Sequence, residues 1–110
     1  VRPAAETGMG AVNRPDFESR IDLTRDVIDF AALAEWSRSN QAGAVVLFLG
    51  TVREMTGDRR TVALDYEAYP EMARAKMQEL ANEAASKWPV IRAAIAHRFG
   101  RLELGDVSVA

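Results

Sequence analysis

The sequence predicts an α+β domain of the split βαβ type, ferredoxin-like or similar to an α/β hammerhead, with a mostly antiparallel sheet. An uncharged, apolar run at 43–52 has the length and composition of a buried strand. An amphipathic pattern at 71–88 is typical of a helix, and the segments 61–69 and 90–99 alternate as half-buried strands do. In chain order the elements read β-α-β-β-α-β-β, and we expect both helices on one face of the sheet.

The composition favours one domain. A chain of 110 residues is long enough for a single compact core, and its 48% hydrophobic and 27% charged content is typical of a globular protein. Residues 1–17 hold two prolines and two glycines without any periodicity. We therefore expect a flexible N-terminal arm at 1–17 and a single α+β domain at 18–110.

The composition also excludes several kinds of function. The chain has no cysteine, which excludes disulfides, thiolate zinc sites and cysteine nucleophiles, and its single histidine, His97, argues against a metal site. A formal net charge of −2 gives no reason to expect nucleic acid as a partner. No apolar run approaches the roughly 20 residues of a membrane helix, and no segment resembles a signal peptide. We expect a cytoplasmic protein with no metal, cofactor or membrane.

The first half of the domain contains a strand, a helix and the apolar run. Alternating apolar residues predict a short edge strand at 20–27. Asp29 is placed to cap a helix that ends near Ser39, with Gly43 as the stop signal. The apolar run then predicts a strand at 44–52 that is buried on both faces.

The second half begins with a Gly-Asp pair inside 54–60, which predicts a hairpin loop before the strand at 61–69. Pro70 suits the first turn of the helix at 71–88, because a proline there loses no hydrogen bond. The apolar face of this helix is expected to consist of Ala73, Met77, Leu80, Ala81, Ala84 and Trp88.

The last part of the chain predicts a strand at 90–99, a bend at Gly100, a turn at Leu104-Gly105-Asp106 and a final strand at 107–110. His97 falls on the same side of the 90–99 strand as its isoleucines. A histidine in that position is more often a hydrogen-bonded core or interface residue than a catalytic one.

Arg53 is the residue that most suggests a binding site. It is the first charge after the apolar run, so a rigid strand would deliver its guanidinium to the edge of the core, which suits a planar or phosphorylated anion. Gly50 suggests that a backbone or ligand must come close there. Arg59 and Arg60 are candidates for a positive rim. The alternatives are an ordinary surface arginine and a solvated loop.

Four motifs, in order along about 21–110, resemble the large, catalytic subunit of molybdopterin synthase. They are the run 43–53, Glu67-Ala68-Tyr69-Pro70-Glu71-Met72, Lys87-Trp88-Pro89, and Ala96-His97-Arg98-Phe99-Gly100 with Leu104-Gly105-Asp106.

The resemblance implies a sulfurtransferase of molybdenum cofactor biosynthesis, which converts cyclic pyranopterin monophosphate into the dithiolene-bearing molybdopterin. Sulfur would come from the C-terminal thiocarboxylate of a small ubiquitin-like carrier subunit. The large subunits would form a homodimer with one carrier at each end, a heterotetramer. Arg53 matches a position in the family's substrate pocket, with Thr51 and Val52 at the same edge, and its expected role is bidentate capture of the substrate phosphate.

The resemblance also places catalytic lysines and a His-Arg pair beyond Ala110. His97-Arg98 matches an earlier motif, and neither Lys76 nor Lys87 matches a catalytic position. We therefore expect the domain to lack its C-terminal part and these 110 residues to be inactive alone. The alternatives are a non-catalytic truncated paralogue that dimerises or binds the carrier, and a ferredoxin-like domain that senses an unrelated metabolite.

Overall fold

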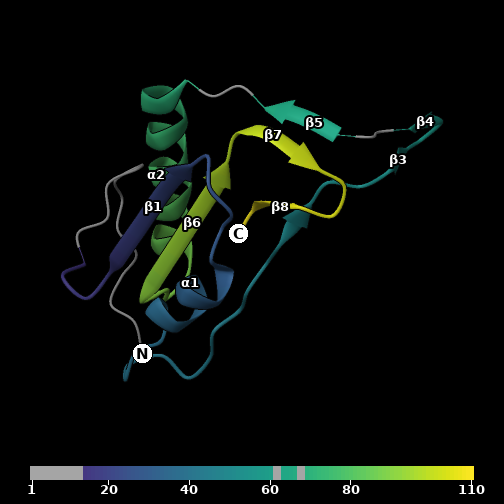
Figure 1. Ribbon diagram of the computed structural model, residues 1–110. Coiled ribbons are helices and arrows are strands. Elements are labelled where there is room, and N and C mark those ends of the chain that lie inside the picture. The colour runs from purple at the N-terminus through teal and green to yellow at the C-terminus, as the bar shows by residue number, and fades with distance from the viewer. Residues whose placement is uncertain (1–13, 61–62, 67–68) are drawn as a thin grey trace.

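The computed structural model describes residues 14–60, 63–66 and 69–110, which form two helices and several short and long strands (Figure 1). In chain order the elements are β1 (Glu18–Thr24), α1 (Phe30–Trp36), β2 (Gly50–Thr51), β3 (Met55–Thr56), β4 (Arg59–Arg60), β5 (Ala63–Tyr66), α2 (Pro70–Lys87), β6 (Arg92–Arg98), β7 (Gly100–Glu103) and β8 (Val107–Val109).

The main sheet has four strands in the order β1-β6-β8-β2. β1 and β6 are parallel, whereas β6–β8, β2–β8, β5–β7 and β3–β4 are antiparallel. The predicted α+β class with a mostly antiparallel sheet is therefore confirmed. Most of the predicted N-terminal arm, residues 1–13, lies outside the described residues. At its end Arg14 donates a hydrogen bond to the carbonyl of Ala85 at 3.0 Å, near the end of α2.

The helix α2 forms where the sequence predicts it, with Pro70 at its first turn, Glu71 near the positive end of its dipole and Lys87 near the negative end. Lys87 donates to Glu83 Oε1 at 2.8 Å, and this hydrogen bond lowers the pKa of the Glu83 carboxyl below its ordinary value.

The buried face of α2 differs from the expected one. Its buried residues are Met77, Ala81 and Ala85, while Leu80 and Trp88 are 49% and 59% exposed. The small side chains of Ala81 and Ala85 let the helix approach the sheet closely, and Leu80 and Trp88 lie outside this buried face.

The two helices cover opposite faces of the sheet, which corrects the expectation that they share one face (Figure 1). In the parallel pair, Ser19 lies opposite Ala93 and Asp22 opposite Ala96, so odd and even positions of both strands point to opposite faces. The odd face meets α2, where the Ser19 hydroxyl lies 2.9 Å from Gln78 Nε2. The even face meets α1, where Ala96 packs with Ile28 and Leu33 in a buried cluster.

The helix α1 is shorter than predicted, but its start is as expected. Asp29 Oδ1 accepts the backbone N–H of Ala32 at 3.0 Å, which confirms the predicted N-cap. The helix ends at Trp36, and Ser37 caps it with its N–H and its hydroxyl directed to the Leu33 carbonyl.

The apolar run at 44–52 is not a strand buried on both faces, and that prediction is wrong. Only Gly50–Thr51 is assigned as strand, at the edge of the main sheet, and Val46 and Phe48 are 92% and 71% exposed. β8, the strand that pairs with β2, offers only Val107–Val109. Residues 44–49 pair with no strand among the described residues and are all exposed, so they do not form part of a sheet that is covered on both sides.

The predicted hairpin loop is confirmed as the two-stranded arm β3–β4, which turns at Gly57 with a φ of +61°. In Figure 1 this arm projects away from the body of the molecule. The strand predicted at 61–69 is present as β5, although 61–62 and 67–68 lie outside the described residues. Its partner β7 was not predicted as a strand.

Leu102 in β7 provides a test of this packing. Its side chain is 0% exposed, so Leu102→Ala should lower the free energy of unfolding by about 2–5 kcal/mol through lost contacts and a cavity. Leu80→Ala is the matched control, because Leu80 is 49% exposed and should change stability by less than about 1 kcal/mol. Urea denaturation measures both, and equal losses would contradict the assignment of Leu102 to the core.

Candidate functional site

The three residues predicted to bind substrate lie together where β2 leaves the main sheet. Thr51 is exposed and pairs with Val107, Val52 is buried, and Arg53 is exposed. The structure therefore presents the Thr51 and Arg53 side chains at the surface and places the Val52 side chain, 3% exposed, in the interior. Val52 thus anchors the backbone between two surface residues.

The backbone before Arg53 is held from the opposite side by β8 and by the turn that precedes it. Val52 N–H donates to the carbonyl of Asp106 at 3.0 Å, and Gly105 N–H donates to the carbonyl of Val52 at 2.8 Å. The Ser108 hydroxyl donates to the carbonyl of Gly50 at 3.2 Å. Together these bonds fix the path of the chain up to the residue that carries the guanidinium.

Gly50 is needed here because of a neighbouring side chain. A Cβ atom at position 50 would lie 2.6 Å from Cγ1 of Val109, a distance that real Cβ atoms do not show. The sequence suggested a backbone or a ligand close to Gly50, whereas the close neighbour in the structure is a side chain, that of Val109 on the adjacent strand. The pairing register also shifts between Gly50 and Thr51, which marks an irregularity in the edge strand.

Sequence reasoning did not predict an ion pair between Arg98, at the end of β6, and Asp106, in the turn before β8. Arg98 Nη1 lies 3.6 Å from Asp106 Oδ2, with side chains 17% and 34% exposed. His97 Nδ1 lies 2.9 Å from the carbonyl of Ser108, so His97 is a half-buried, hydrogen-bonded residue as predicted. The motifs that hold these residues were visible in the sequence, but they gave no sign that Asp106 and Arg98 would meet.

Two further arginines at this end of the sheet make defined contacts. The Arg25 guanidinium lies over the Phe99 ring, 4.4 Å from its centroid. Arg60, a candidate for the positive rim, pairs with Glu54 at 3.2 Å, with both side chains more than half exposed. The backbone of Arg59 belongs to β4, and its side chain lies outside the description.

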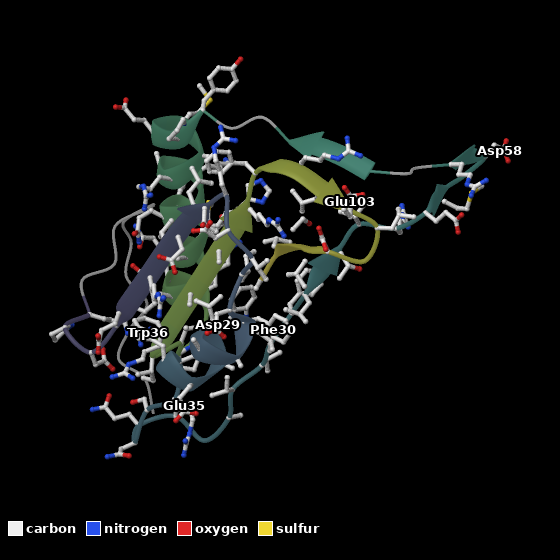
Figure 2. All side chains as sticks on the ribbon, viewed as in Figure 1. Asp29, Phe30, Glu35, Trp36, Asp58 and Glu103 are labelled. Carbon is white, nitrogen blue, oxygen red and sulfur yellow. The ribbon has the colours of Figure 1, made fainter. Side chains whose placement is uncertain are left out.

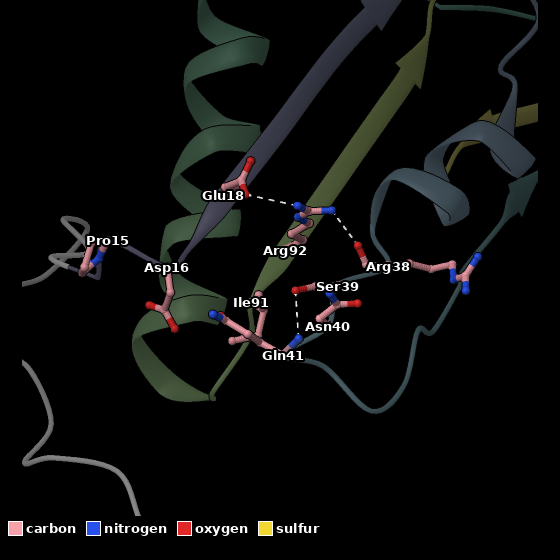
Figure 3. A pocket seen from close by; sticks show the side chains of 9 residues that line it. All are labelled: Pro15, Asp16, Glu18, Arg38, Ser39, Asn40, Gln41, Ile91 and Arg92. Carbon is pink, nitrogen blue, oxygen red and sulfur yellow. Dashed lines mark hydrogen bonds and ion pairs between the residues drawn. The ribbon is translucent and has the colours of Figure 1, made fainter.

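A second polar region lies at the other end of the main sheet. In Figure 2, Glu103 marks the site end, whereas Glu35 and Trp36 mark this opposite end. A pocket of about 510 Å³ opens here, and Figure 3 shows Glu18 and Arg92 among its lining residues. Arg92 pairs with Glu18 at 3.4 Å and donates to the Arg38 carbonyl at 2.6 Å, so the charge of this arginine is already compensated by a neighbouring carboxylate.

An apolar groove of about 530 Å³ runs beside the exposed stretch 44–48 and is lined by β6 and β8 residues such as Ile95 and Val109. Thr51, Val52 and Arg53 line neither this groove nor the polar pocket. Within the part of the chain that the structure describes, no group of three or more His, Cys, Asp or Glu residues is arranged to hold a metal. No described helix is long and apolar enough to cross a membrane.

Comparison with known proteins points to one family. The sequence model of the MoaE protein family matches residues 23–110. A molybdopterin synthase catalytic subunit of Halalkalibacterium halodurans is 53% identical over 68 residues, which cover 62% of this chain and 44% of that protein. The one from Bacillus subtilis is 39% identical over 90 residues, covering 82% and 57%. The chain thus spans about half the length of the curated relatives it matches.

Solved structures agree with the sequence matches. A molybdopterin biosynthesis MoaE protein from Burkholderia ambifaria superposes with a TM-score of 0.73 at 34% identity, over 84% of this chain and 60% of that one. The molybdopterin synthase structure from Staphylococcus aureus gives a TM-score of 0.67 at 35% identity, over 88% and 68%. Sequence and fold therefore indicate the same relationship.

The contact between Gly50 and Val109 can be tested by substitution. Gly50→Ala should lower the free energy of unfolding by about 1–3 kcal/mol, because the stiff, β-branched Val109 cannot move aside without strain. Adding Val109→Ala should recover part of the loss. Gly43→Ala is the control, since nothing lies within 4 Å of a Cβ at that position. Thermal denaturation measures all variants, and no recovery in the double variant would contradict the contact.

Proposed function

The chain belongs to the MoaE protein family, and on that basis we propose that it acts as the catalytic subunit of a molybdopterin synthase. The reaction is transfer of sulfur from a thiocarboxylated, ubiquitin-like carrier subunit to cyclic pyranopterin monophosphate. The proposed setting is the cytoplasm, and the proposed assembly is a homodimer of large subunits with one carrier at each end. The names of the relatives favour this enzyme over a non-catalytic carrier-binding paralogue and over a sensor of an unrelated metabolite.

The observation that carries the proposal is the place of Arg53. It is an exposed arginine that follows directly on a backbone segment held by two hydrogen bonds from the turn before β8. A guanidinium on a fixed backbone can bind two oxygens of a phosphate at once, and the rigid attachment lowers the entropy cost of doing so. Thr51 is exposed on the same edge, and its hydroxyl can donate a second hydrogen bond to the anion.

The chemistry needs positive charge near the reacting carbon. The thiocarboxylate is an anion, and its reaction develops oxyanion charge that fixed cations stabilise. Lys76 and Lys87 do not suit this role, because both are exposed on α2 and pair with Glu79 at 3.8 Å and with Glu83 at 2.8 Å. Their positions support the proposal that the residues present here bind substrate without carrying out transfer alone.

Arg53→Ala tests the binding role. The variant should bind cyclic pyranopterin monophosphate about 10–100-fold more weakly in isothermal titration calorimetry, because charge-assisted hydrogen bonds contribute about 1.5–3 kcal/mol. The affinity of Arg53→Lys should lie between those of the parent and Arg53→Ala, since an ammonium keeps the charge but cannot form the bidentate pair. Arg38→Ala is the control, because Arg38 is also a surface arginine, 69% exposed, but lies at the opposite end of the sheet. Unchanged binding by Arg53→Ala would exclude the proposed role.

Turnover is a separate test. Given thiocarboxylated carrier and cyclic pyranopterin monophosphate, the 110-residue chain should bind the pterin but form no detectable molybdopterin. The fluorescence of oxidised molybdopterin measures the product, and a matched relative such as the Bacillus subtilis catalytic subunit is the positive control. Product formation by these 110 residues at the rate of that control would show that they contain the catalytic groups.

A further inference from the structure

The turn that joins β7 to β8 holds the backbone of the residue directly before Arg53. The carbonyl of Val52 belongs to the peptide bond that leads into Arg53, and it accepts the N–H of Gly105 at 2.8 Å. The N–H of Val52 donates to the carbonyl of Asp106 at 3.0 Å. Because both polar backbone groups of Val52 are bound by adjacent residues of one turn, the orientation of that peptide bond depends on the shape of the turn.

The side chain of Asp106 maintains that shape. Its Oδ2 accepts the backbone N–H of Glu103 at 2.9 Å, and its own N–H donates to the Glu103 carbonyl at 3.1 Å. Gly105 supplies the positive φ of +85° that the turn needs. The side chain of Asp106 therefore adds a second hydrogen bond to the backbone bond that closes the turn, and a residue without a side-chain acceptor would make only the backbone bond.

The same carboxylate oxygen also faces a charge. Arg98 Nη1 lies 3.6 Å from Asp106 Oδ2, and the Arg98 side chain is only 17% exposed. Within the described residues, Nε of Arg98 is buried without a hydrogen-bond partner. Arg98 therefore depends on Asp106 for compensation of its charge, and the pair ties the turn to the end of β6.

We propose that Asp106 is a positioning residue for Arg53, acting through the turn and the peptide bond of Val52 and not by contact with substrate. This inference rests on the proposed function of Arg53 as the anion-binding group. A loosened turn lets the plane of the Val52–Arg53 peptide unit tilt about the flanking single bonds, and the guanidinium then samples directions that do not meet the phosphate. Small displacements of a binding group lower affinity strongly, so the loss should appear in pterin binding.

A double-mutant cycle on cyclic pyranopterin monophosphate binding tests the proposal. Asp106→Ala should weaken binding about 3–10-fold by calorimetry, and Asp106→Asn should restore much of it, because the amide oxygen still accepts the Glu103 N–H. In the Arg53→Ala background, Asp106→Ala should cause no further loss. Asp22→Ala is the matched control, since Asp22 also accepts from an arginine, Arg20, at 2.9 Å, but on β1 away from the turn.

The outcomes separate this inference from the proposed function. If Arg53→Ala binds as tightly as the parent, the anion-binding role itself is wrong. If Arg53→Ala weakens binding but Asp106→Ala does not, or if Asp106→Ala weakens it equally in the Arg53→Ala background, the positioning role is overturned. Thermal denaturation of each variant confirms folding, and Asp106→Asn answers the question should Asp106→Ala fail to fold. In that case Gly105→Ala, which strains the same turn at a φ of +85°, should also weaken pterin binding, and parent-like binding by both Asp106→Asn and Gly105→Ala would overturn the positioning role.

Discussion

The parallel pairing of β1 with β6 is the constraint on which the rest of the structure depends. Seven residue pairs, from Glu18 opposite Arg92 to Thr24 opposite Arg98, hold two strands that are distant in sequence. The side chains of β1 and β6 alternate between the two faces of the sheet, so this strand pair needs an apolar cover on each side. The helices α2 and α1 supply one each. The positions of both helices therefore depend on their packing against β1 and β6 and not on packing against each other.

The candidate site depends on how the chain leaves this strand pair. β6 ends at Arg98, Gly100 bends the backbone with a φ of +89°, and β7 and β8 bring the chain back beside β6, where His97 lies opposite Val109. Only then can β8 offer an edge to β2. The backbone that leads into Arg53 is thus held by a turn about 50 residues later in the sequence, although Arg53 itself follows an apolar run.

Sequence reasoning succeeds here wherever local chemistry decides the outcome. The cap at Asp29, the helix start at Pro70 and the hairpin at Gly57 each follow from the side chain or the backbone freedom of one residue. It fails wherever neighbours decide. The run at 44–49 has the composition of a buried strand, yet among the described residues it finds no strand to pair with and is exposed, and the Arg98–Asp106 pair follows from the path of β7. Neither the exposure of this run nor the ion pair can be predicted from a local sequence pattern.

Because Gly50 packs against Val109, the side chains that are tolerated at these two distant positions of the chain depend on each other. A mutation that gives position 50 a side chain is harmful as long as the valine is present, and it becomes acceptable once position 109 has been reduced to a smaller residue. Lineages that carry a larger residue at 50 should therefore carry a smaller one at 109, and the order of the two substitutions in descent is fixed by the clash.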